Sequence, residues 1–238
     1  MARLILLALM LCAGPAAAQD ITVSLGNGES LAGRSMLLIA AITLLGLAPG
    51  LAIMVTCFPF LVTVLSILRQ ALGLQQSPPN MLIVSLALFL TWFIMEPVFL
   101  ESWRNGIEPL IAGRLELPAA FELGIAPFRL FMAGRTDPDT FATLLDLRPG
   151  AAGSGIGEAP LSVLVPSFML SEISRAFEIG FLVFLPFLII DLVVSAVLMS
   201  MGMMMVPPAI VALPFKLAFF VVADGWVLVS NALVRGYM

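Results

Sequence analysis

The stretch LPFLIIDLVVSAVLMSMGMMMVPPAIVALPFKLAFF, residues 185–220, predicts two apolar helices that fold back on one another about a methionine-rich turn. Each arm carries one charge, Asp191 before the turn and Lys216 after it. Residues 199–208 hold five methionines and one glycine and end at Pro207 and Pro208. Because a proline lacks the N–H that a helix interior needs, this pair marks the end of one helix or the start of the next.

The composition around this hairpin predicts an all-α integral membrane protein. The chain has 238 residues, of which 61% are hydrophobic and 11% charged, and a mean hydropathy of +1.11. Soluble domains carry about 25% charged residues, so this chain has too few charges to cover a soluble surface. Its formal net charge of −4 also excludes a basic surface for nucleic acid.

The residue types do not support catalysis. The chain has no histidine, which is the commonest general base and metal ligand, and only two cysteines, Cys12 and Cys57. No glycine-rich phosphate loop is found in the strand-to-helix context that such loops need. We therefore expect a protein that is not an enzyme, with no metal site and no cofactor.

Residues 1–18 predict a cleaved secretory signal peptide. Arg3 supplies the positive charge, residues 4–13 the apolar run and Ala16–Ala18 the small residues before cleavage. The alternative is a retained first anchor, but the apolar run is too short to span a membrane. The mature chain is thus expected to start outside the cytoplasm.

The rest of the chain divides into three predicted regions. A lead-in and a first hydrophobic hairpin occupy residues 19–100, and a second hairpin with the methionine turn occupies 166–238. Between them, residues 101–165 predict a small helical periplasmic subdomain, since 13 of the chain's 26 charges lie from Glu101 to Glu158. The hairpins contribute four hydrophobic segments, kinked by proline and glycine, near residues 37–68, 81–100, 179–200 and 209–234.

Two of these segments carry specific expectations. Pro49-Gly50 and Pro59 are expected to divide the first segment into two helical pieces or a hairpin. Residues 81–95, followed by Glu96-Pro97, are marginal in length for a span. With the start outside and four crossings, Arg69 and Lys216 fall on cytoplasmic turns, in agreement with the positive-inside rule.

Charges within the apolar runs suggest an ion pair. An unpaired charge there costs about 2.5–3.5 kcal/mol on insertion scales, so we expect Asp191 and Lys216 to pair, within one chain or between neighbouring copies. In one alternative, Lys216 extends to the interface and Asp191 stays neutral. In another, the carboxylates form a proton relay that includes Glu96 and Glu178. Glu172 and Arg175, three residues apart, are interpreted as an ordinary surface pair.

The clustered methionines allow three interpretations: apolar filler, a copper(I) site of soft thioethers, or a deformable apolar collar formed when copies assemble. A copper site would need histidine or cysteine nearby, whereas glycine, valine and proline surround this cluster. We favour the collar, because unbranched side chains could exclude water and still yield to a passing chain.

Two long motifs resemble the FliP family of type III export-gate proteins. The first is LPFLIIDLVVSAVLMSMGMMMVPP with LPFKLAFFVVADGW, within residues 185–226. The second is VLSILRQALGLQQSPPNMLIVSLALFLTWFIMEPV, residues 64–98. With the leader and FRLFMAGRTDPDTFATL, the resemblance extends over nearly the whole chain. One departure is that Pro59 and Phe60 stand where the family usually has threonine and arginine.

The resemblance implies a core subunit of the flagellar type III protein export gate in the inner membrane at the basal body. Several copies, with five expected, would wind into a helical ring with FliQ-type and FliR-type subunits, and FlhA/FlhB-type proteins would join the gate. Unfolded rod, hook and filament proteins would pass through it. Membrane lipid is a further expected partner and nucleic acid is not. The alternatives are the equivalent subunit of a virulence secretion system and a proton-coupling transporter subunit.

Carried onto this sequence, the family's functional residues fall into three sets. The pore gasket corresponds to Met201, Gly202, Met203, Met204 and Met205. The charge contact between subunits corresponds to Asp191 and Lys216. The remaining motif residues are Arg69, Pro78, Pro79, Pro207, Pro208, Asp224, Gly225 and Trp226.

Overall fold

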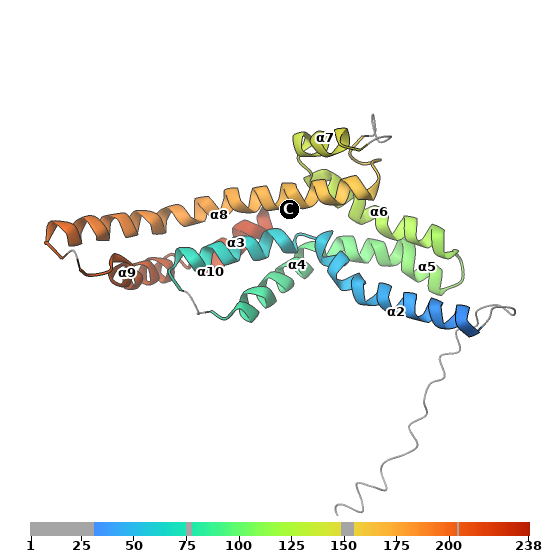
Figure 1. Cartoon of the computed structure of the whole chain (residues 1–238), viewed down its shortest axis with the longest axis horizontal. Helices are drawn as coiled ribbons and strands as arrows, with labels where there is room; N and C mark the ends of the chain where they lie inside the picture. The colour runs from blue at the N-terminus through green and yellow to red at the C-terminus, as the bar shows by residue number, and fades with distance from the viewer. Residues whose placement is uncertain (1–30, 75–77, 149–154, 204) are drawn as a thin grey trace, which may run out of the picture. The chain divides into compact units, whose positions relative to one another are not determined.

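The computed structural model describes residues 31–74, 78–148, 155–203 and 205–238 (Figure 1). The predicted signal peptide, residues 1–18, and Met204 lie outside this part of the chain. Every regular element in the described residues is helical. The described chain divides into two units, one that includes residues 31–47 and one that begins at residue 48. Helix α2 (Leu31–Met54) begins in the first unit, and all later helices belong to the second.

The expected division of the first hydrophobic segment is found near Pro59 but not at Pro49-Gly50. The backbone of α2 stays helical through residues 49 and 50 and ends at Met54. Helix α3 (Phe58–Ala71) follows with Pro59 in its first turn, where the missing N–H has no helical partner to lose. The break at residues 55–57 therefore separates two helices, as predicted for this proline.

Helix α3 forms the centre of the second unit. Its residues Leu61, Val64, Leu65 and Leu68 are fully buried, at the spacing of one helix face. This face packs mainly against α8 (Leu161–Ser200) and also against α4 (Asn80–Ser102).

The apolar run at residues 81–95, marginal for a span by itself, lies within a longer helix that agrees with the segment predicted near residues 81–100. Helix α4 continues through Pro97 to Ser102 and leads directly into a π-helical turn, η1 (Trp103–Ile107), and α5 (Glu108–Ile111). The combined stretch Asn80–Ile111 has 32 residues. Pro97 removes one helical hydrogen bond but does not end the helix. The residues on both sides of it keep helical geometry.

The charged central region is helical. Helix α6 (Leu117–Arg135) crosses η1 closely: a Cβ on Gly106 would lie 2.7 Å from the Cα of Gly124. Helix α7 (Pro138–Asp146) is capped by Asp137, whose carboxylate accepts a hydrogen bond from the Thr140 backbone N–H at 2.8 Å. This backbone hydrogen bond lowers the pKa of Asp137.

The second hairpin consists of α8, α9 (Pro208–Val222) and α10 (Gly225–Arg235). Helix α8 is continuous over 40 residues, through Pro166 and Pro186, and runs along α3 and α9 (Figure 1). Helices α9 and α10 meet at a bend of 62°. Asp224 has a left-handed backbone conformation at this bend, with φ of 49°.

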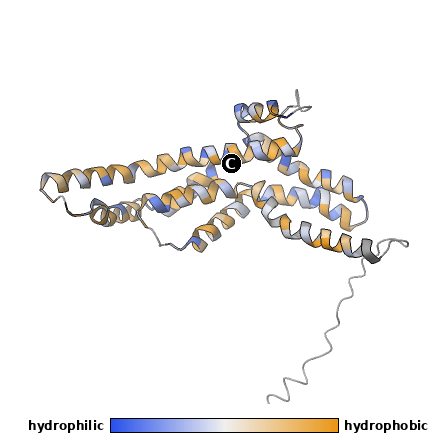
Figure 2. Cartoon of the chain, viewed as in Figure 1, coloured by the Kyte–Doolittle hydropathy of each residue, from blue (hydrophilic) through white to orange (hydrophobic). Residues whose placement is uncertain are grey.

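Two stretches of the described chain are long and apolar enough to cross a membrane, Asn80–Ile111 and Leu161–Ser200. The bent pair α9–α10 would make a third if it is counted as one broken span. Figure 2 shows apolar residues along most of α8. The structure therefore supports an all-helical membrane protein.

Candidate functional site

The methionine turn closes α8 with a hydrogen-bonded helix cap. The N–H of Met203 donates to the carbonyl of Leu198 at 3.0 Å, and the N–H of Gly202 donates to the carbonyl of Met199 at 3.0 Å. This pair of bonds is the Schellman motif, which requires a left-handed residue after the helix. Gly202 occupies that position with φ of +73°. Glycine adopts this conformation without the steric cost that a Cβ would bring.

Three methionines of this turn are exposed. The exposed fractions are 67% for Met201, 44% for Met203 and 97% for Met205. Met201 and Met203 also line one end of an open apolar groove of ≈ 560 Å³ between α8 and α9, whose other walls include Val197 and Phe215. Large apolar side chains concentrated on an exposed turn are typical of a surface that contacts another molecule.

Asp191 and Lys216 form an ion pair within the chain. Lys216 Nζ lies 2.6 Å from Asp191 Oδ2 and also donates to the carbonyl of Ala71, the last residue of α3, at 3.0 Å. The Lys216 side chain is 7% exposed and that of Asp191 is 34% exposed. One ammonium group therefore joins both arms of the second hairpin to the end of α3.

One oxygen of this carboxylate lacks a partner. Asp191 Oδ1 is buried and accepts no hydrogen bond from the described residues. A buried acceptor of this kind requires an explanation, because most such groups in native structures are paired. The expected contact between subunits through these two residues stays a prediction.

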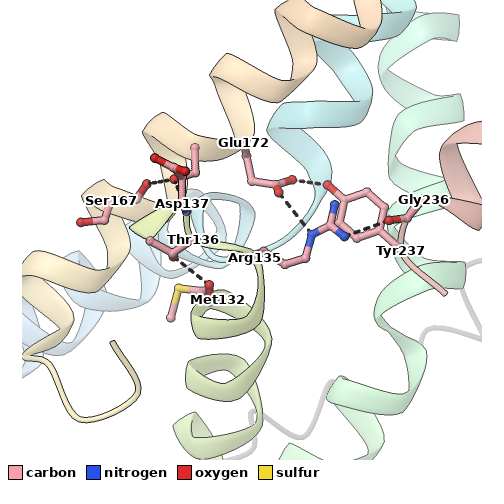
Figure 3. Close-up of polar contacts among 9 residues, drawn as sticks. Met132, Arg135, Thr136, Asp137, Ser167, Glu172, Gly236 and Tyr237 are labelled. Carbon is pink, nitrogen blue, oxygen red and sulfur yellow. Dashed lines mark hydrogen bonds and ion pairs between the residues drawn. The ribbon is translucent and has the colours of Figure 1, made fainter. Parts of the chain in front are cut away.

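A second polar cluster joins α6, α8 and the residues that follow α10 (Figure 3). Glu172 is fully buried, and its Oε1 lies 3.4 Å from Nε of Arg135. Its Oε2 accepts a hydrogen bond from the hydroxyl of Tyr237. The interpretation of Glu172 and Arg175 as a surface pair is therefore wrong, because the carboxylate of Glu172 points into the protein and engages residues from two other segments.

Arg135 contacts each of the other members of this cluster. Its Nη1 donates to the carbonyl of Gly236 at 2.8 Å, and its Cζ lies 3.9 Å from the centre of the Tyr237 ring. Its Nη2 is buried and has no hydrogen-bond partner in the described structure. Burial, followed by the nearby charge of Glu172, raises the pKa of Tyr237 well above its ordinary value. The cluster thus binds the segment after α10 to the body of the second unit.

Sequence reasoning missed this cluster because its members lie far apart in the chain. Arg135 and Glu172 are separated by 37 residues, and Glu172 and Tyr237 by 65. One signal in the sequence points to this cluster. The chain has a single tyrosine, Tyr237, and its hydroxyl needs a hydrogen-bond partner that the neighbouring apolar residues do not supply.

The remaining predicted motif residues lie at helix ends. Arg69 donates a hydrogen bond to the side chain of Asn80, and Pro79 immediately precedes α4. Pro207 and Pro208 stand at the start of α9. A Cβ on Gly225 would lie 2.1 Å from the ring of Phe220, and Trp226 packs edge-on against the same ring at 5.4 Å. Within the described residues, no group of three or more histidine, cysteine or carboxylate side chains is placed to hold a metal ion.

Comparison with known proteins identifies relatives over most of the chain. The FliP family profile matches residues 41–233. Flagellar biosynthetic protein FliP of Caulobacter vibrioides is 50% identical over 226 residues, which cover 94% of this chain and 85% of the relative. The Rhizobium meliloti protein of the same name is 41% identical over 238 residues, with coverage of 98% and 97%. That of Bacillus subtilis is 42% identical over 200 residues, with coverage of 84% and 90%.

Proposed function

Because the chain belongs to the FliP family, we propose that it acts as a core subunit of the flagellar type III protein export gate. Its relatives are named for flagellar biosynthesis, which favours the flagellar system over the virulence counterpart. Its role in the gate would be structural and not enzymatic. The gate's substrates would be unfolded rod, hook and filament proteins.

The exposed methionine turn is the observation that supports a pore role most directly. Met201, Met203 and Met205 project from a turn that the cap at Gly202 holds in one conformation. In a ring of copies these turns would meet and form the gasket predicted for residues 201–205. Methionine suits this role because its unbranched, polarizable side chain adapts its shape to what passes.

Assembly would complete contacts that one chain leaves open. We propose that several copies, with five expected, combine with FliQ-type and FliR-type subunits and lie beside FlhA/FlhB-type proteins in the inner membrane. The unpartnered Oδ1 of Asp191 could accept a donor from a neighbouring copy, so that the Asp191–Lys216 pair would serve both the hairpin and the interface. The central helices would face the periplasm.

The geometry gives less support to a proton-coupling subunit. Asp191 and Lys216 join the two arms of the second hairpin at 2.6 Å, an arrangement that fits a structural ion pair. Asp224, the other candidate, is exposed at the bend between α9 and α10.

A matched pair of triple variants tests the gasket. The first replaces Met201, Met203 and Met205 by alanine in the assembled gate. The control replaces three methionines of similar exposure outside the turn, Met36, Met81 and Met238, which are 76%, 80% and 84% exposed. We expect the turn variant to assemble normally but to conduct small ions in planar bilayers, while the control stays closed. If the turn variant assembles and stays as tight as the control, the gasket role is wrong.

A further inference from the structure

An apolar groove with a cationic end runs between α8 and α10. Two adjoining cavities, ≈ 150 Å³ and ≈ 310 Å³, share four lining residues, Ile179, Val183, Leu228 and Val229. They therefore form one groove rather than two sites. Arg135 and Arg175 line only the first cavity, whereas Pro186 and Phe187 line the second. The groove is thus apolar along its length and has guanidinium groups at one end.

Positive charge exceeds negative charge at this end. Both oxygens of Glu172 are engaged, one by Arg135 and the other by the hydroxyl of Tyr237. Arg175 lies near enough to influence Glu172 electrostatically, but it makes no hydrogen bond or close ion pair with the described residues. One carboxylate therefore faces two guanidinium groups. Glu178, the next acidic residue on α8, is exposed.

A buried donor adds a second observation. Nη2 of Arg135 has no partner in the described structure, although most buried donors in native proteins are paired. Figure 3 shows that the other nitrogens of this guanidinium are directed to Glu172 and Gly236. Arg135 and Arg175 both line the first cavity, so two guanidinium groups lie beside any anion bound there.

The position along the chain fits a membrane interface. Arg175 lies four residues before Ile179, where a run of 37 residues begins that contains Asp191 as its only charge. The groove follows α8 from Arg175 into this run as far as Phe187. A charged end beside an apolar channel is complementary to an amphiphile with an anionic head and a hydrocarbon tail. Basic pockets between membrane helices bind lipid headgroups in this way.

We propose that this groove binds an anionic phospholipid, with its phosphate beside Arg135 and Arg175 and one acyl chain along α8 and α10. The phosphate would balance the excess positive charge of Arg135 and Arg175. The acyl chain would cover Ile179, Val183 and Leu228, of which Leu228 is 62% exposed in the free chain. This proposal depends neither on the proposed export function nor on the methionine turn.

Native mass spectrometry of the full chain in a mild nonionic detergent tests it, with phosphatidylglycerol and phosphatidylcholine offered in equal amounts. We expect the protein to retain phosphatidylglycerol preferentially. Arg175→Gln should weaken that retention about fivefold, the effect of one cation near a lipid surface. Arg175→Lys should restore most of it, and Arg104→Gln, which removes a charge from exposed residue 104, should leave it unchanged.

A second pair of variants tests the acyl-chain channel. Ala232→Phe fills the first cavity, which Ala232 lines, and should reduce retention of both lipids. Ala142→Phe, at an exposed position of α7, is the matched control. Size-exclusion profiles show whether each variant remains folded.

Four results would overturn the proposal. Equal retention of the two lipids would show that the groove does not recognise the headgroup. Equal losses of retention in Arg175→Gln and Arg104→Gln would indicate general charge attraction. Displacement of the lipid by inorganic phosphate alone would indicate a free-anion site. Cross-linking of a second copy into the groove, with lipid excluded, would identify a subunit interface instead.

Discussion

Lys216→Met is expected to weaken the second hairpin strongly, because Lys216 is the only cation within reach of Asp191 in the described structure. Removal of one partner of a buried ion pair costs about 3–5 kcal/mol. Since the Asp191 side chain is 34% exposed, solvent screens part of this loss, and we expect roughly 2–3 kcal/mol. In a chain of 238 residues this lowers the melting temperature by about 4–12 °C.

The assay is thermal unfolding of the purified chain in detergent, followed by intrinsic tryptophan fluorescence. Arg114→Met is the matched control: Arg114 and Glu108 form a pair at 3.8 Å with side chains 64% and 55% exposed, and such pairs contribute about 0–1 kcal/mol. The double variant Asp191→Asn/Lys216→Met should recover about half of the loss, because it leaves no unpaired charge. Equal shifts for Lys216→Met and Arg114→Met, or no recovery in the double variant, would refute the reasoning.

Two further outcomes are expected from the cap and from the tyrosine cluster. Gly202→Ala places a Cβ at φ of +73°, at a cost of about 1 kcal/mol, so hydrogen exchange at the Met203 amide should accelerate about fivefold. Gly202→Asn should show a smaller change, and unchanged exchange in both would contradict the cap. Tyr237, the single tyrosine, should stay protonated above its ordinary pKa of about 10 in the folded chain, as its tyrosinate absorbance would report. Its folded-state pKa lies above the unfolded value, so stability should fall as the pH rises through 10 in the natural chain but not in Tyr237→Phe. Ionisation near pH 10 before unfolding would contradict the buried hydrogen bond.

Local sequence signals predicted the helix ends better than the helix lengths. Pro59, Pro79 and Pro208 stand at helix starts, because a proline restricts its own φ and the backbone of the residue before it. Pro97 did not end α4, since the helical bonds on either side of it outweigh the one that it removes.

The contacts of a charged residue could be predicted from the sequence only where all of its neighbours in the chain are apolar. Asp191 and Lys216 each stand alone in an apolar run, so the cost of burial pointed to a pair, which the structure forms within the chain. Glu172 lies in a mixed stretch where an exposed position is equally plausible. Its burial depends on Arg135 and Tyr237, which only the tertiary fold brings to it.

The length of α8 limits how it can lie in a bilayer. Its 40 residues extend about 60 Å at 1.5 Å per residue, and a hydrocarbon core is about 30 Å thick. An upright α8 would therefore leave roughly half its length outside the hydrocarbon, and only a tilt of about 60° would immerse it entirely. The first half carries Glu172, Arg175 and Glu178, and the second half carries Asp191 alone. If the charged half of α8 projects from the hydrocarbon core, the apolar half crosses it. Glu178 and the methionine turn then lie at opposite faces of the core, about one core thickness apart along the helix.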